Sequence, residues 1–142
     1  MFLLDTDYAV LLQWERNPAL ARLLARMADW SPGDFYFPII AFHEQVLGAN
    51  AYISRTRSSE QIVRGYQMLQ TVLTDFSRAQ VLPFDAAAEQ AFQDLRKRRV
   101  RVATMDLRIG AIALSRRMTV LTRNLADFNR IPDVKVEDWT VE

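Results

Sequence analysis

Short apolar segments alternate with helical segments along this chain, and this alternation limits the possible folds more than any other feature. Each apolar segment is long enough for one short strand and is followed by residues with the three-to-four spacing of an amphipathic helix. Strands that alternate with helices form mainly parallel sheets with helices packed on both faces. The expected strands are residues 2–4, 35–40, 80–84, 119–122 and 134–136.

The helix ends can be predicted from local signals. Asn17-Pro18 divides the first helical segment, residues 8–28, because proline lacks an amide donor and disfavours helix at the residue before it. Ser58 begins a capping box, and Asp85 can cap the helix that follows. The remaining helices are expected at residues 41–57, 58–78, 86–98 and 107–117, and residues 124–133 are expected to form a turn.

The composition is that of an ordinary globular domain. The chain has 142 residues, half of them hydrophobic, so we expect one domain spanning residues 1–142 with a buried core. Its 18 basic and 17 acidic residues nearly cancel, so net charge argues neither for nor against nucleic acid. The absence of cysteine excludes disulfides and thiolate metal sites. No secretion signal or membrane-spanning run is evident, and a cytoplasmic location is expected.

Four acidic residues occupy corresponding places in this pattern. Asp5 follows the first strand, Glu44 lies early in the helix after the second, Asp106 begins a helix and Asp127 follows the fourth strand. Sites in parallel sheets form at the carboxyl ends of the strands, so these side chains can converge. Clustered carboxylates require a raised pKa or a bound cation, and oxygen ligands favour Mg²⁺ or Mn²⁺. The pattern therefore suggests metal-assisted hydrolysis of a phosphodiester.

Each acid also has a simpler interpretation. Asp5 and Asp106 could be helix caps, Glu44 an ordinary solvated side chain and Asp127 a turn former. Position alone leaves both interpretations open.

Three stretches resemble the PIN-domain family. MFLLDTD is similar to the family's opening, and FHEQVLG to its helix with a glutamate near a glycine. The stretch ATMDLRIGAIALSRRMTVLTRNLADFNRIPDVKVEDW resembles the C-terminal block, with its LTxNxxDF motif and final V-x-x-W. The resemblance, closest to small VapC-type toxins, implies a three-layer α/β/α sandwich with about five strands and an endoribonuclease that requires Mg²⁺ or Mn²⁺.

The resemblance also implies site residues and partners. The acidic metal site falls on Asp5, Glu44, Asp106 and Asp127, and Thr122 and Asn124 are candidates to support it, since a hydroxyl at 122 could orient Asp5 or a metal-bound water. The implied partners are RNA and a VapB-like antitoxin, whose C-terminal segment would bring a basic side chain to the carboxylates. A homodimer formed through helices of the first half is implied as well.

Some residues remain open to two interpretations. Asp7 stands where the family usually has asparagine, and could cap the first helix or contact a metal through water. His43, the only histidine, is expected to serve in packing or RNA contact rather than as a ligand. The basic residues between 96 and 101 could contact phosphate or form a solvated helix end.

Other functional classes also place acids at strand ends. Asp5-Thr6-Asp7 is similar to the start of haloacid-dehalogenase-like phosphatases, but those enzymes and receiver-like domains need a lysine after a strand, and neither Lys97 nor Lys135 is suitably placed. The remaining alternative is a catalytically silent module with this fold that binds protein or RNA.

Overall fold

The computed structural model describes all 142 residues and contains one sheet of five strands. The strand order is β3-β2-β1-β4-β5, and every neighbouring pair is parallel. The strands are β1 (Phe2–Leu4), β2 (Phe35–Pro38), β3 (Val81–Leu82), β4 (Thr119–Leu121) and β5 (Lys135–Glu137). The predicted α/β class is confirmed, and the sheet is entirely rather than mainly parallel.

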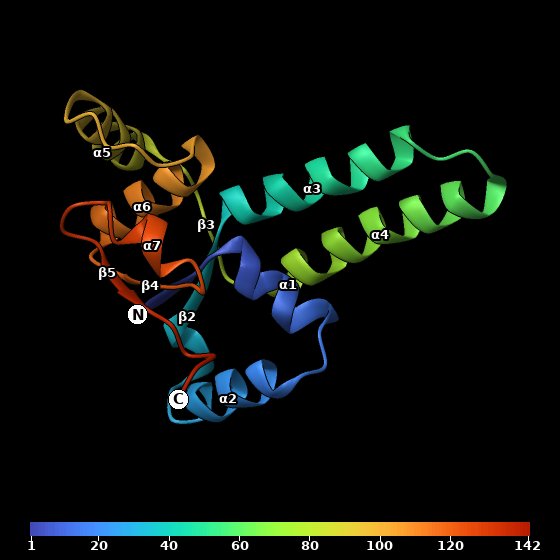
Figure 1. The fold of residues 1–142 in the computed structure, drawn as a ribbon, viewed down its shortest axis with the longest axis horizontal. Helices are drawn as coiled ribbons and strands as arrows, with labels where there is room; N and C mark the ends of the chain where they lie inside the picture. Colours follow the sequence, from blue (N-terminus) through green and yellow to red (C-terminus); the bar gives the residue numbers. More distant parts are fainter.

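Helices cover both faces of the sheet. They are α1 (Thr6–Trp14), α2 (Pro18–Met27), α3 (Ile39–Ser54), α4 (Ser59–Arg78), α5 (Ala86–Lys97), α6 (Thr104–Arg116) and α7 (Leu125–Phe128). Helices α5, α6 and α7 lie on one side and α1 and α2 on the other, while the α3–α4 hairpin extends away from the sheet (Figure 1). None of the helices combines the length and apolarity needed to cross a bilayer.

The side chains of strand β1 show why helices cover both faces of the sheet. Successive side chains of a strand point to opposite faces. Leu3 joins a core with the α5–α6 side, which includes Phe92 and Ile112. Phe2 and Leu4 instead join a core with helices α1 and α2. A strand buried on both faces reads as a continuous apolar run rather than an alternating one.

The predicted cap of α5 is present, because the Asp85 side chain accepts a hydrogen bond from the Ala88 amide. Asn17, which was expected only to interrupt the helical segment, also caps α2 by accepting a hydrogen bond from the Leu20 amide. The Ser58 hydroxyl accepts a hydrogen bond from the Gln61 amide, as predicted, but the Gln61 side chain accepts from the Arg57 amide and so does not complete the capping box. The predicted caps follow from residues three positions apart, so the sequence alone suffices to place them.

Several predicted boundaries were wrong. The second strand ends at Pro38 rather than at residue 40, because Ile39 already begins α3. Helix α6 begins at Thr104, so Asp106 lies in its first turn instead of opening it. The segment expected to be only a turn contains the short helix α7. Short apolar runs do not distinguish a strand end from a helix start.

The hairpin of α3 and α4 depends on a close approach at Gly65. A Cβ atom there would lie 2.5 Å from Ile53 Cγ1, whereas one at Gly48 in α3 would meet nothing within 4 Å. We therefore expect Gly65→Ala to lower the free energy of unfolding by about 1 to 2 kcal/mol, the overpacking cost less the gain in helix propensity. Gly48→Ala is the matched control and should raise it by about 0.5 to 1 kcal/mol. Urea denaturation measures both, and equal shifts would contradict this packing.

Candidate active site

A polar hollow of about 490 Å³ opens at the carboxyl edge of the sheet. Its lining contains no hydrophobic residue and consists of Asp5, Thr6, Asp7, Glu44, Asp106, Arg123 and Asn124. Asp5 directly follows β1, Glu44 lies in the second turn of α3 after β2, and Asp106 lies in the first turn of α6. The parallel arrangement thus brings three of the four predicted acids to one place. Asp127, in α7, stands beside the hollow without lining it.

The Asp5 carboxylate is buried and held at both oxygens. Its Oδ1 accepts a hydrogen bond from the Tyr8 amide at 3.0 Å, and its Oδ2 accepts one from the Thr122 hydroxyl. Asp5 is therefore the N-cap of α1 as well as a lining residue, so the two interpretations of this residue hold together. Burial raises the pKa of Asp5 to about 7, with smaller contributions from the charges of Asp7 and Asp106.

Two threonine hydroxyl groups hold acidic side chains of the hollow in place. Thr6 donates a hydrogen bond to Glu44 Oε1 at 2.7 Å, a contact that the sequence analysis missed. Its only sequence signal was its place next to Asp5. Thr122 is fully buried, and its hydroxyl oxygen accepts a hydrogen bond from the Asn124 amide at 2.9 Å. It therefore links Asp5 to the backbone that follows β4.

The side chains of Asp106 and Asp127 belong to the same electrostatic cluster. Asn124 Nδ2 donates to Asp127 Oδ2 at 2.9 Å, which places this amide between the hollow and α7. Burial raises the pKa of Asp106, and the charges of Glu44 and Asp127 raise it further. Within this cluster Asp106 is influenced by neighbouring carboxylates and by no basic side chain.

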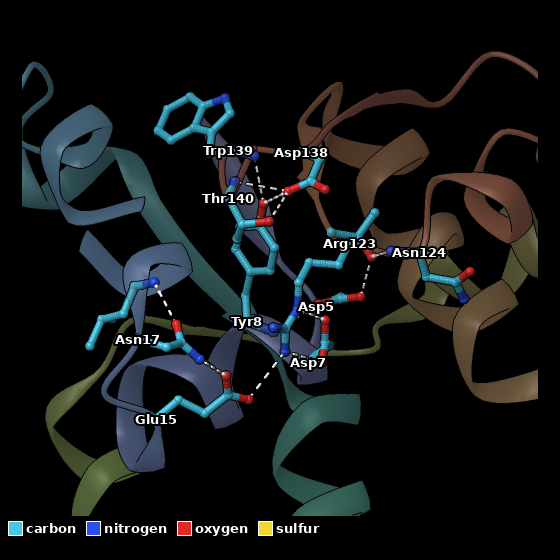
Figure 2. A network of polar contacts seen from close by, with 12 residues as sticks. Asp5, Asp7, Tyr8, Glu15, Asn17, Arg123, Asn124, Asp138, Trp139 and Thr140 are labelled. Atoms are coloured by element: carbon cyan, nitrogen blue, oxygen red, sulfur yellow. Dashed lines mark hydrogen bonds and ion pairs between the residues drawn. The ribbon is translucent and has the colours of Figure 1, made fainter. Parts of the chain in front are cut away.

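Asp7 has a different role from the predicted helix cap. Because Asp5 caps α1, Asp7 is free to bind Arg123, which donates from Nε at 2.6 Å and from Nη2 at 2.7 Å. Nη2 also donates to Glu15 Oε1 at 3.3 Å, so Arg123 lies between the carboxylates of Asp7 in α1 and of Glu15, which follows α1 (Figure 2). Hydrogen bonds from Arg123 hold the pKa of Glu15 below its usual value, and those carboxylates raise the pKa of Arg123.

The other residues left open lie outside the hollow. His43 is exposed on α3, and the basic residues between 96 and 101 lie at and beyond the end of α5. Of that basic group, Arg98 makes an ion pair with Asp133 at 3.9 Å, in which both side chains are largely exposed.

The donor chemistry of the hollow fits a hard divalent cation. The charged metal ligands that the lining offers are carboxylate oxygens, and neither histidine nor cysteine lines the site. No three acidic or histidine side chains stand close enough to hold one ion by themselves. Mg²⁺ commonly binds through one or two carboxylates and completes its shell with water and substrate phosphate, so an open acidic hollow meets its needs.

The fold and this acidic edge define a class of protein. The sequence model of the PIN domain family matches residues 2–134, which is most of the chain. The chain therefore belongs to the PIN domain family.

Individual relatives narrow the assignment to its VapC-type members. The tRNA(fMet)-specific endonuclease VapC of Salmonella typhimurium is 31% identical over 104 residues, which are 70% of this chain and 71% of the relative. The structure of DNA-bound VapBC from Salmonella typhimurium is similar with a TM-score of 0.72 and 25% identity, and the match covers 97% of both chains. VapBC-1 from nontypeable Haemophilus influenzae shares the fold, with a TM-score of 0.74, 23% identity and coverage of 99% and 98%. A haloacid-dehalogenase-like or receiver-like assignment is thereby excluded.

Proposed function

We propose that this chain is a metal-dependent endoribonuclease and the toxin of a VapBC-type toxin–antitoxin pair. The observation that carries the proposal is the convergence of Asp5, Glu44 and Asp106, from three separate elements, on one hollow without apolar lining. The similarity to an endonuclease named for its action on tRNA(fMet) supports RNA as the substrate. We also propose that residues 1–142 form a single PIN domain, as the match over residues 2–134 suggests.

The four acids would together attract Mg²⁺ or Mn²⁺, with one or two of their carboxylates as direct ligands and water or substrate phosphate completing the shell. When bound, the ion neutralises charge on the reacting phosphate and lowers the pKa of the attacking water. The chain's own contribution is to fix the carboxylates. Thr122 and the Tyr8 amide hold Asp5, and the Thr6 hydroxyl holds Glu44. Asn124 holds Asp127 at the side of the hollow.

A catalytically silent binding module is the second candidate. It is favoured by one observation, that no three of the acids stand close enough to hold an ion without further ligands. The two candidates differ in whether the folded protein binds a divalent cation at the hollow and cuts RNA there.

The deciding experiment uses purified protein, initiator tRNA and Mg²⁺ or Mn²⁺, with EDTA as a blank. We expect cleavage only with metal, and we expect Asp106→Asn to lose it because one candidate ligand is removed. Asp29→Asn is the matched control, since Asp29 is exposed and lies outside the hollow. The metal should also raise the melting temperature of the unsubstituted protein and of the control. It should raise the melting temperature of Asp106→Asn much less. The absence of both cleavage and a metal-induced thermal shift would favour the silent module.

The proposed protein partner is a VapB-like antitoxin. Several similar structures are described as VapBC complexes, some of them with DNA. The acidic hollow suits the basic side chain that a C-terminal antitoxin segment would bring to it. Co-expression with the product of a short neighbouring reading frame should yield a complex and suppress cleavage. Separate elution of the two proteins would contradict this partnership.

We further propose a homodimer, located in the cytoplasm. Large apolar side chains are exposed on the hairpin of α3 and α4, namely Leu47, Ile62, Val63, Tyr66 and Leu73. Exposed apolar side chains gathered on one element are typical of a protein interface. Light scattering of the purified chain measures its oligomeric state directly.

A further inference from the structure

Arg123 is the only basic residue that lines the hollow. It follows Thr122 at the end of β4, on the same stretch of chain that holds Asp5 and Asp127. The sequence motif singled out its neighbours at 122 and 124, and neither the metal site nor the support of the carboxylates uses Arg123. A cation among four carboxylates therefore needs its own explanation.

The contacts of Arg123 fix the direction of its guanidinium. Nε and Nη2 face the Asp7 carboxylate as a pair of parallel hydrogen bonds, and Nη2 also reaches Glu15. The planar guanidinium carries its five N–H donors in a rigid fork. Since one edge is held by α1, the two N–H groups of Nη1 remain without a partner in the chain. Figure 2 shows the guanidinium between Asp7 and Glu15.

The ion pairs of Arg123 do more than add stability. The side chains of Arg123, Asp7 and Glu15 are 31%, 42% and 30% exposed, and pairs at such partly exposed places add only modestly to folding even when one of them is bidentate. The pairs also orient Arg123, because two carboxylates hold a guanidinium that would otherwise move freely in solvent. An oriented guanidinium with free donors is suited to bind a phosphate.

A nucleic-acid strand needs such a contact here. Asp5, Asp7, Glu44 and Asp106 line the hollow and repel phosphate groups, and a bound divalent cation offsets only part of that charge. Arg123 itself lines this hollow, so a strand that enters it passes beside the guanidinium.

We propose that Arg123 is a substrate-binding residue that donates its Nη1 hydrogens to a phosphate oxygen of the RNA, while Asp7 and Glu15 orient it. This inference rests on the proposed ribonuclease function. It also gives a reason for an aspartate at position 7, because asparagine could not offer two carboxylate oxygens to the guanidinium.

The test measures RNA binding separately from cleavage. Labelled initiator tRNA is titrated in Mg²⁺ with protein carrying Asp106→Asn, which keeps the RNA intact and leaves the contacts of Arg123 unchanged. Adding Arg123→Ala should weaken binding on the order of tenfold, the usual effect of losing a hydrogen bond to a charged group. It should also reduce the slope of log Kd against log salt concentration by about 0.7 to 0.9, the value for one phosphate contact. Melting temperatures should stay close to that of the parent.

Two further variants make the outcome specific. Arg78→Ala removes the same charge from the exposed end of α4, at the opposite edge of the sheet, and should change neither affinity nor slope. If Arg123 only neutralised Asp7, the double variant Asp7→Asn/Arg123→Ala would recover affinity. Under the proposal the double variant stays weak, because the Nη1 donors are still missing.

The outcomes separate this inference from the proposed function. If the unsubstituted protein neither cleaves nor binds tRNA, both are wrong. If it does both, but Arg123→Ala behaves like Arg78→Ala or the double variant recovers, only the role of Arg123 is overturned.

Discussion

Asp5→Asn is expected to abolish RNA cleavage and, at the same time, to stabilise the metal-free protein at pH 8. Burial raises the pKa of Asp5 to about 7 in the folded state from an ordinary value of 3.8. The folded protein therefore holds this proton more tightly than the unfolded chain does. The stabilisation from that proton is complete below about pH 4 and is lost as the pH rises through 7. At pH 8 the native state contains a buried, ionised carboxylate that asparagine removes.

The stability gain should be large at high pH and small at low pH. A rise of about three pKa units corresponds to at most roughly 4 kcal/mol at pH 8, and the gain should fall to less than half of that at pH 5, where Asp5 is protonated in the native state but still mostly ionised in the unfolded chain. Asparagine can still accept the hydrogen bond from the Tyr8 amide, so the cap of α1 is kept. Denaturation in EDTA at the two pH values measures the effect. A variant that is less stable than the parent at pH 8 would contradict it.

Loss of cleavage should accompany that gain. We expect at least a hundredfold reduction, beyond the 10- to 100-fold range typical of residues that only orient metal ligands. A substitution that stabilises the fold while removing activity marks a residue kept for function at a cost in stability. Residual activity close to that of the parent would exclude Asp5 as a ligand.

Local sequence signals predicted most of the fold. The order of strands and helices follows from apolar periodicity, and the caps at Ser58 and Asp85 follow from residues three positions apart. The same signals failed at Pro38, where a strand passes directly into a helix. Proline is accepted both at a strand end and at the start of a helix, so the residue type does not mark the boundary.

The candidate site was only partly predictable for a related reason. Placing acids after strands requires only the fold class, and Asp5, Glu44 and Asp106 could be placed in this way. The pairs that orient the site join residues far apart in the chain, such as Thr6 with Glu44, 38 positions away. Asp7 and Arg123 are 116 positions apart. No periodicity links such pairs, so only the folded chain shows which side chains meet.

Thr122→Val should impair both stability and cleavage, because one hydroxyl serves two buried groups. It donates to Asp5 and accepts from the Asn124 amide, and the residue is fully buried. Valine has the same shape but leaves the Asn124 amide and the Asp5 carboxylate without this partner. We expect the free energy of unfolding to fall by about 1 to 3 kcal/mol. Cleavage should fall about 10- to 100-fold, as for other groups that orient a metal ligand.

Two variants separate the loss of this hydroxyl from a general change in the strand. Thr119→Val makes the same substitution in β4, where the side chain is half-buried and makes no hydrogen bond, and it should leave cleavage unchanged. Thr122→Ser keeps the hydroxyl and should restore most of the activity, although it leaves a methyl-sized gap. Because the hydrogen bond from Thr122 lowers the pKa of Asp5, its removal should also shift the pH dependence of cleavage upward. A Thr122→Val enzyme that keeps full activity and the original pH profile would show that Asp5 is oriented without this hydroxyl.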